Sequence, residues 1–258
     1  MLLSALALLA CTGTKNDSTT GDSQAADSGT TDTDTNSGDS GMGDTAATPA
    51  ACPSRKPHDI PGAHWEDMYA GPAIVDYDVV AATDFNGMTV YPSHATQSGE
   101  STGVPWSDDT AWMHACDTDG AKLYGDIELY TNDGLTDSYT VIYDPPELYW
   151  PADAAVGSTW HTDGTGTWSE DASDGTHTDF GAFAEPEDWE IVADNVAKSV
   201  PAGDYTTLEV HHTGIYNDTT YDAEEFVADG VGAVHSDDNA TASTNYDLTA
   251  CSGVPGCP

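Results

Sequence analysis

The chain has 258 residues, which leaves room for one domain of ordinary size and an additional tail. Its 45 aspartate and glutamate residues stand against only 5 lysine and arginine residues, so the formal net charge is −40. Nucleic acids and anionic lipid surfaces would repel such a chain, and we exclude both as partners of the polypeptide surface.

The chain begins with ten apolar residues, MLLSALALLA, which end at Cys11. Residues 1–10 are too few to span a bilayer core of about 30 Å, so we interpret them as an export signal. Leu8-Leu9-Ala10-Cys11 resembles the lipobox of bacterial lipoprotein signal peptides, in which the cysteine is lipidated and becomes the first mature residue. The resemblance implies a membrane anchor at Cys11 in the cell envelope. Thr12 in the following position favours the outer membrane.

Residues 11–51 consist almost wholly of Ser, Thr, Asp, Gly and Ala, with no aromatic side chain. Such a segment cannot bury enough apolar surface to offset the entropy of ordering it, and we predict a disordered tether. It contains Gly38-Asp39-Ser40-Gly41, the run that surrounds the nucleophilic serine of trypsin-like proteases. A flexible tether cannot hold a base and oxyanion donors in place, so we reject a protease function.

The composition changes near Cys52, and we predict one acidic folded domain over residues 52–258. Lipidation of Cys11 would leave four cysteines: Cys52, Cys116, Cys251 and Cys257. An even number in an exported chain predicts two disulfides, for which three pairings are open. Because Cys52 lies at the start of the domain and Cys251 and Cys257 lie near its end, we expect the bridges to fasten its ends. Metal binding by cysteine is not expected, since the chain has no Cys-x-x-Cys pair.

From Ile74 onward, apolar and polar residues alternate, as over residues 121–129 and 245–250. This period of two is typical of half-buried strands in antiparallel sheets, with one dry and one wet face. Turn signals separate the runs: Asn86-Gly87, Asp119-Gly120, Asp133-Gly134, Asp163-Gly164, Asp174-Gly175 and Pro201-Ala202-Gly203. We predict about ten strands in an all-β antiparallel meander that forms a half-barrel, barrel or sandwich. Short helical turns near residues 65–68 and 108–112 are alternatives to strand there.

No motif predicts a catalytic or metal site. Most of the nine histidines stand apart, and the adjacent His211 and His212 would point to opposite faces of a strand. The acidic residues are spread along the domain, which favours hydration in a saline habitat over a dedicated cation site. We therefore expect no cofactor beyond weak, non-specific Ca²⁺ binding. A hydrolase with two carboxylates stays an alternative, but any two acids would qualify.

Aromatic residues provide a hint of binding. Seven Trp and twelve Tyr outnumber four Phe, so most large rings carry a polar edge that suits partial exposure. On a sheet face such rings stack on sugars or line a groove for lipid. Tyr and Trp are also good strand formers, which explains the same count without a ligand.

Three segments of the second half resemble those of a broad set of β-rich bacterial envelope lipoproteins with a half-barrel shape. They are Gly157-Ser158-Thr159-Trp160, Val200-Pro201-Ala202-Gly203 and Gly230-Val231-Gly232, within about residues 150–250. Each has a structural meaning, because proline and glycine set turns and paired glycines permit a bend. The resemblance therefore implies a fold and a location rather than an activity.

Together these observations predict a non-enzymatic, lipid-anchored envelope protein whose domain has a binding or structural role. The partner that we expect is a lipid, a glycan or another envelope protein. A carbohydrate-binding module that uses exposed Trp and Tyr is the main alternative. The ligand-binding residues are not predicted by any pattern in the sequence.

Overall fold

The computed structural model describes residues 51–69, 74–101, 103–216, 219–238 and 245–258. The predictions for residues 1–10, for Cys11 and for most of the tether, including Gly38-Asp39-Ser40-Gly41, lie outside the described residues. The described chain belongs to one compact unit and is built from strands, without a helix among these residues. The strands are β1 (His64–Tyr69), β2 (Ile74–Val79), β3 (Thr83–Phe85), β4 (Met88–Ser101), β5 (Val104–Cys116), β6 (Gly120–Asn132), β7 (Leu135–Pro151), β8 (Thr159–Thr162), β9 (Thr165–Asp171), β10 (His177–Ala184), β11 (Glu187–Val200), β12 (Gly203–Tyr216), β13 (Thr219–Ala228), β14 (Gly232–Asp238) and β15 (Tyr246–Ser252).

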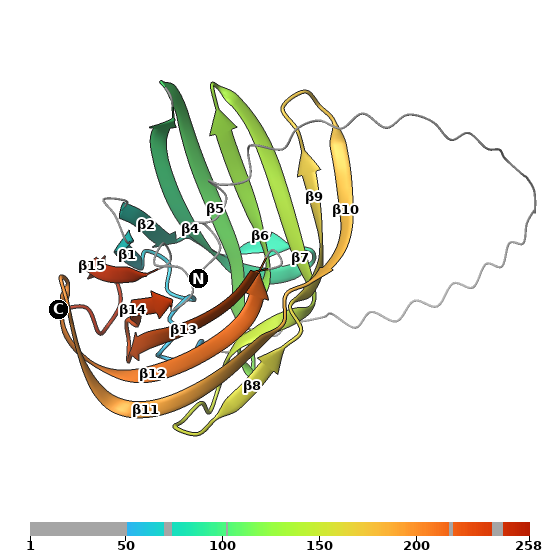
Figure 1. Cartoon of the computed structure of the whole chain (residues 1–258). Helices are drawn as coiled ribbons and strands as arrows, with labels where there is room; N and C mark the ends of the chain where they lie inside the picture. Colours follow the sequence, from blue (N-terminus) through green and yellow to red (C-terminus); the bar gives the residue numbers. More distant parts are fainter. Residues whose placement is uncertain (1–50, 70–73, 102, 217–218, 239–244) are drawn as a thin grey trace, which may run out of the picture. The chain divides into compact units, whose positions relative to one another are not determined.

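These strands form one antiparallel sheet, so the predicted all-β fold is confirmed. The order is β10-β9-β7-β6-β5-β4-β2-β1-β15-β14-β13-β12-β11-β8, and β3 pairs with β4 beside this path. The sheet is strongly curved and open, with β10 and β8 as its two edges (Figure 1). Of the predicted alternatives, this is the half-barrel. The expected strand number was too low, and residues 65–68 and 108–112 lie in β1 and β5 rather than in helical turns.

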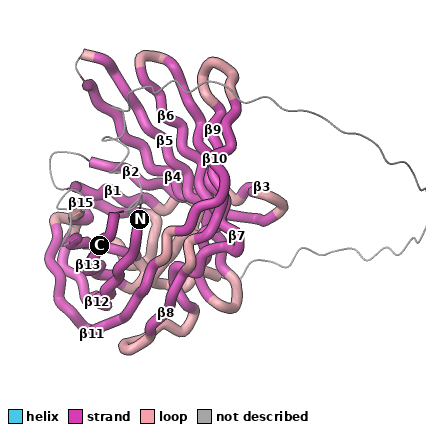
Figure 2. The backbone as a smooth tube through the Cα atoms, turned by 45° about the vertical axis from the view of Figure 1, so that its right-hand side comes forward, coloured by secondary structure: helices cyan, strands magenta, loops and turns pink. Residues whose placement is uncertain are grey.

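Most of the predicted turns close hairpins between neighbouring strands (Figure 2). Asn86-Gly87 joins β3 to β4 and Asp133-Gly134 joins β6 to β7, each with positive φ at both residues. This is the backbone of a type I′ turn. Asp163-Gly164 is the exception, because β8 pairs with β11 while β9 pairs with β7. The meander is therefore interrupted there.

The curvature is held by packing between strands that are distant in the sheet. We call inner the face that carries Asp108, Trp112, His114 and Cys116 of β5. At the lower end of this face, side chains of β5–β7 pack against those of β11–β13, which lie across from them (Figure 1). The members of this core are Cys116, Ala121, Tyr149, Trp150, Trp189, Ile191, Leu208, Val210 and Val227. A smaller core on the outer face packs β3 against β4 and β5: Phe85, Val90, Ala111, Met113 and Ala115.

Two disulfides fasten the described chain, Cys52–Cys116 and Cys251–Cys257. The structure thus selects one of the three pairings that were open. The first bridge attaches the segment before β1 to the lower end of β5. The same segment is tied to β13, because Arg55 Nη1 donates a hydrogen bond of 3.1 Å to the carbonyl of Val227.

A β-bulge in β6 decides which side chains face inward. His114 of β5 pairs with Leu123, but Trp112, two residues earlier, pairs with Asp126, three residues later. The extra residue exchanges the two faces of β6 above this point. Gly125 lies in the bulge, where an added Cβ would lie only 2.9 Å from the Phe85 ring. As a result, the polar face of upper β6, from Asp126 towards the turn at 133–134, faces inward.

Candidate ligand-binding site

A row of polar side chains crosses the upper inner face over five neighbouring strands. The register places Asp108 opposite Gln97, Thr110 opposite Glu128, Glu128 opposite Tyr139, and Tyr139 opposite Glu170. Hydrogen bonds join neighbours along the row. Gln97 Nε2 donates to Asp108 Oδ2 at 3.2 Å, and Tyr139 OH donates to Glu170 Oε1 at 3.1 Å. We call Asp108, Asp126, Glu128 and Glu170 the carboxyl row.

Aromatic rings lie on the same face beside the carboxyl row. They are Trp106 of β5, Tyr130 of β6, Tyr139 of β7 and Trp168 of β9, which we call the aromatic set. Trp168 is 36% exposed and stacks at 3.8 Å on Phe180, which is 44% exposed. The Trp106 ring lies across Gly99, where an added Cβ would be only 2.7 Å from it. The face therefore offers partly exposed rings between carboxyl groups.

Burial and mutual repulsion raise the pKa values of three acids of the row, Asp108, Asp126 and Glu128. Burial, and then the charge of Asp108, raises the pKa of Glu128 to about 7. Burial, and then the charges of Glu128 and Glu185, raises the pKa of Asp126 to about 7. Asp126 is only 7% exposed, and its Oδ2 has no hydrogen-bond partner among the described protein atoms.

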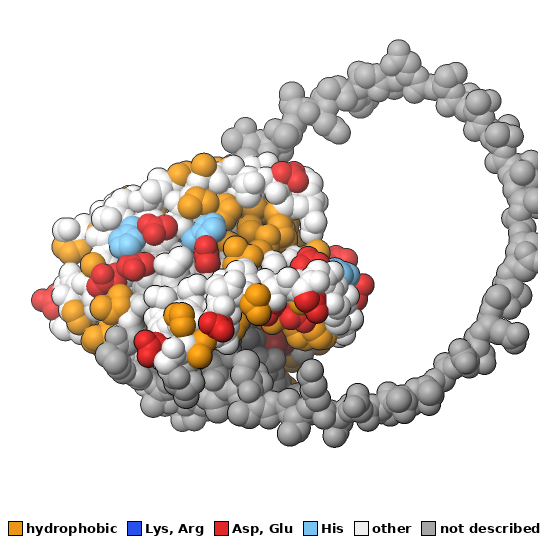
Figure 3. All heavy atoms as spheres, turned by 90° about the horizontal axis from the view of Figure 1, so that it is seen from above, with side chains coloured by type: hydrophobic (Ala, Val, Ile, Leu, Met, Phe, Trp, Pro, Cys, Tyr) orange, Lys and Arg blue, Asp and Glu red, His pale blue; other side chains and the backbone are white. Residues whose placement is uncertain are grey.

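The described basic side chains are engaged elsewhere. Lys56 is 3.1 Å from Glu225, Lys122 is 2.6 Å from Asp117, and Lys198 lies over the Phe226 ring. Arg55 donates to a backbone carbonyl of β13. Figure 3, which looks down on the upper end, shows hydrophobic and acidic side chains close together and no lysine or arginine among the described residues in view. None of the described lysine and arginine side chains thus provides a countercharge for the carboxyl row.

Two further acids, Asp67 and Glu225, are buried at the lower inner face. Lys56 Nζ contacts Glu225 Oε2, and Tyr246 OH donates to Glu225 Oε1 at 3.3 Å. Burial alone would raise the pKa of Glu225, but the charge of Lys56 lowers it to about 2. Burial, and then the charge of Glu225, raises the pKa of Asp67 to about 8. Opposed shifts are typical of hydrolase carboxylates, but Glu225 is already paired with Lys56 and Tyr246 inside the lower core, which favours a structural role.

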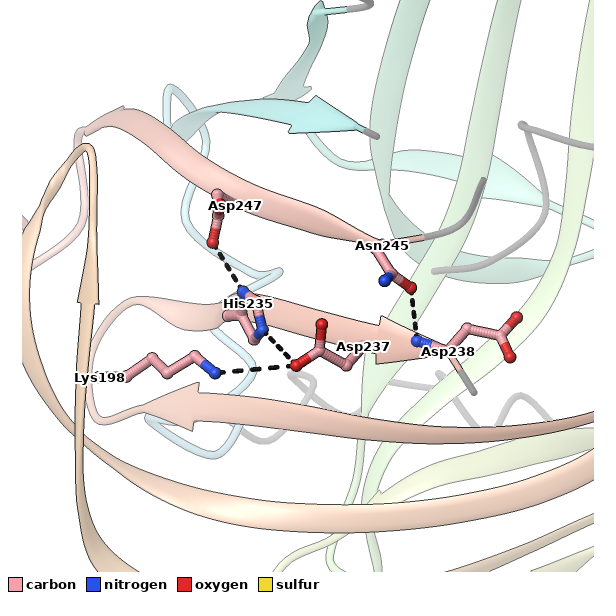
Figure 4. Close-up of polar contacts among 6 residues, drawn as sticks. All are labelled: Lys198, His235, Asp237, Asp238, Asn245 and Asp247. Carbon is pink, nitrogen blue, oxygen red and sulfur yellow. Dashed lines mark hydrogen bonds and ion pairs between the residues drawn. The ribbon is translucent and has the colours of Figure 1, made fainter. Parts of the chain in front are cut away.

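The nine histidines fall into two groups. Six are at least partly exposed on the sheet surface and contact an aspartate through a ring nitrogen: His64–Asp78, His94–Asp109, His161–Asp188, His177–Asp171, His211–Asp222 and His235–Asp247. Figure 4 shows how His235 bridges Asp247 at 2.6 Å and Asp237 at 2.8 Å, with Lys198 at the far side of Asp237. In a chain with few lysines, histidine takes over as the cross-strand partner of acids.

The remaining histidines, His58, His114 and His212, are buried and stack on other rings. His211 and His212 lie on opposite faces of β12, as the sequence predicts. Within the described ranges, no three His, Cys, Asp or Glu side chains are arranged to hold a metal ion. Weak Ca²⁺ binding stays a prediction.

A depression of about 540 Å³ on β8, β11 and β12 is a second concave surface. Its lining residues are Thr159, Trp160, His161, Asp188, Trp189, Glu190, His211 and Thr213. Both histidines of this depression contact aspartates. His161 contacts Asp188 at 2.9 Å and Asp163 at 3.3 Å, and His211 contacts Asp222 at 2.8 Å. The upper inner face is therefore the stronger candidate.

Sequence reasoning did not find this site. A signal was present in the acids and rings that recur at one parity in adjacent strands, Trp106-x-Asp108-x-Thr110 and Asp126-x-Glu128-x-Tyr130. Alternation over residues 121–129 predicts that Asp126 and Glu128 lie on the wet face of a strand, and residues 108–112 allow a strand or a helical turn. The bulge in β6 and the curvature of the sheet turn that face inward instead.

The carboxyl groups of the inner face predict how stability depends on pH. Burial is the main cause that raises the pKa of Asp67 to about 8. It likewise raises the pKa values of Asp126, Glu128 and Glu147 to about 7. In an unfolded chain they titrate near pH 4. Between pH 4 and 8 the folded chain therefore holds protons that the unfolded chain has released, and its stability rises as the pH falls through that interval.

We expect the free energy of unfolding to increase from pH 8.5 to 6.5, by on the order of 1 kcal/mol per pH unit for each proton bound. Burial lowers the pKa of His58, His114 and His212, so these groups oppose the trend only below about pH 6.5, where the unfolded chain protonates them. Denaturant titrations at pH 8.5, 7.5, 6.5 and 5 measure the effect. Asp126→Asn should flatten the slope. A stability that stays constant between pH 8.5 and 6.5 would contradict this account.

Fold and site together define an open β half-barrel with an acidic and aromatic inner face. No known protein family matches the chain, and no curated protein matches it. Two solved structures are similar. One is a protein of Bacteroides fragilis described as exported, with a YmcC-like fold: 13% identity over 80% of this chain and 100% of that chain, TM-score 0.35. The other is a protein of Parabacteroides distasonis described as a lipoprotein: 11% identity over 79% and 99%, TM-score 0.34. The described residues contain no helix long and apolar enough to cross a membrane.

Proposed function

We propose that this chain is an exported, lipid-anchored protein of the bacterial cell envelope whose half-barrel binds a ligand without transforming it. The lipobox-like run ending at Cys11 and the polar tract 11–51 support an anchored domain on a tether. Two disulfides support an oxidising compartment outside the cytoplasm. Thr12 favours the outer membrane, and the net charge of −40 argues against a nucleic acid partner.

The observation that carries the binding function is the upper inner face, where the aromatic set alternates with the carboxyl row. Aromatic rings accept the apolar faces of sugar rings, while carboxyl and amide groups pair with hydroxyls. A lipid chain would instead require a continuous apolar groove, and burying the carboxyl row against it would be costly. A glycan is therefore the ligand class that this face fits best among lipid, glycan and protein.

A hydrolase is less well supported by the same geometry. Asp67 and Glu225, the acids with opposed pKa shifts, are both enclosed in the lower core. Within the carboxyl row, Asp108, Asp126 and Glu128 have pKa values shifted in one direction, upward. We therefore assign binding rather than catalysis to this domain.

The test is binding of envelope components to the full chain in detergent. Native mass spectrometry after exposure to a detergent extract of the envelope should show a discrete mass in the oligosaccharide range. Trp106→Ala and Trp168→Ala should each weaken its binding roughly tenfold, because each removes a stacking ring. Tyr205→Ala, a half-buried ring on β12, is the matched control and should bind normally. A bare protein in the extract, or variants that bind as tightly as the wild type, would refute the proposal.

A further inference from the structure

The carboxyl row presents several acids to one another without a base between them. In addition to burial, which is the larger cause, the charge of Asp108 raises the pKa of Glu128 and that of Glu128 raises the pKa of Asp126, so their charges interact along the face. The four described basic residues are held at the lower core, at the β5–β6 turn and on the outer face. The folded chain therefore supplies acceptors here without a matching cation.

The floor of this face adds a second, independent observation. Asp126 and Trp112 are opposite each other in the register of β5 and β6, and they are 7% and 3% exposed. Asp126 Oδ2 and Trp112 Nε1 have no hydrogen-bond partner among the described protein atoms. Buried polar groups in folded proteins are almost always paired. An acceptor and a donor at the floor of the face thus indicate that it is built for a polar group from outside the chain.

The charge of the face selects among glycans. Uronic, sulfated or phosphorylated sugars would be repelled by the carboxyl row. Neutral sugars would pair with single carboxyl groups but would leave the repulsion between them unchanged. A sugar ammonium donates up to three charge-assisted hydrogen bonds and compensates neighbouring carboxylates at the same time.

Building on the proposed glycan-binding function, we propose that the ligand of the upper inner face is a glycan that carries free, positively charged amino groups. The ammonium groups contact the carboxyl row, and the aromatic set stacks on the sugar rings. The ligand thus brings the cation that this face of the protein lacks.

The experiment compares three probes of six units each by titration calorimetry on the full chain in detergent at pH 6.5: a glucosamine hexamer, an N-acetylglucosamine hexamer and hexalysine. We expect the glucosamine hexamer to bind at least about tenfold more tightly than either other probe. Its binding should weaken when salt is raised from about 50 mM to 500 mM, because exposed charges are screened.

Variants locate the effect. Glu128→Gln keeps the shape of the side chain and should weaken the glucosamine hexamer about tenfold, more than it weakens any binding of the acetylated hexamer. Asp126→Asn is a second variant of the same row. Glu100→Gln, an exposed acid on the outer face of β4, is the matched control and should bind as the wild type does. Thermal unfolding shows that each variant is folded.

The outcomes separate the two proposals. Equal binding of both sugar hexamers overturns the requirement for amino groups and leaves glycan binding intact. Hexalysine that binds as tightly as the glucosamine hexamer overturns the glycan part, because the face would then be a site for cationic peptides. Failure of the glucosamine hexamer to bind overturns this inference, whereas the fate of glycan binding itself depends on the envelope extract.

Discussion

Replacing Lys56 by methionine is expected to lower the free energy of unfolding by about 3–5 kcal/mol. Lys56 is 3% exposed, and its Nζ lies 3.1 Å from Glu225 Oε2 within the lower core. The substitution leaves the Glu225 carboxylate buried without a countercharge, and removing one partner of a buried ion pair costs far more than the pair contributes. Methionine retains the length and the contacts with the Tyr149 and Trp150 rings, so loss of packing is a minor effect.

Guanidinium titrations at pH 7 measure this change, and a double-mutant cycle tests its cause. Lys56→Met combined with Glu225→Leu removes both charges and should be clearly more stable than Lys56→Met alone. The matched control is Lys122→Met, which breaks the pair with Asp117 at the more exposed β5–β6 turn and should cost less than about 1 kcal/mol. If Lys56→Met cost no more than Lys122→Met, the buried pair would have no structural role.

Removing the Cys52–Cys116 disulfide, as Cys52→Ser with Cys116→Ser, is expected to cost about 4 kcal/mol. The bridge joins residues 64 positions apart, and in the chain-entropy model a long closed loop restricts the unfolded chain strongly. It also holds the segment that carries Lys56 against β5, so its loss would loosen the same lower core. The measurement is denaturant unfolding of the full chain in detergent, with and without a reductant.

The second disulfide provides the control for that experiment. Cys251–Cys257 joins residues only 6 positions apart, for which the same model gives about 2 kcal/mol. Serine substitutions there remove the same number of sulfur atoms, but the loop that they release is much shorter. Equal losses from the two double variants would show that loop closure is not what makes the long bridge stabilising.

Much of the fold could be predicted from local patterns. Alternation with a period of two identified strands, and Asn86-Gly87 and Asp133-Gly134 identified hairpins, because their positive φ values are required by the turn itself. The site could not be predicted in the same way. Asp126 and Glu128 look like solvent-facing residues of a strand, and only the bulge at Gly125 reverses their direction.

The sequence by itself determined that this is an all-β chain of strands joined by tight turns, because turn chemistry and side-chain alternation depend on neighbouring residues only. It also carries the expectation of a lipid anchor at Cys11. The tertiary structure alone decided that β8 pairs with β11, which cysteines join, and that Lys56 is buried against Glu225. These contacts link residues far apart in the chain, since the curvature of one open sheet brings β5–β7 against β11–β13. The same curvature turns a polar strand face into an inner surface, which is why the candidate site emerges only from the folded chain.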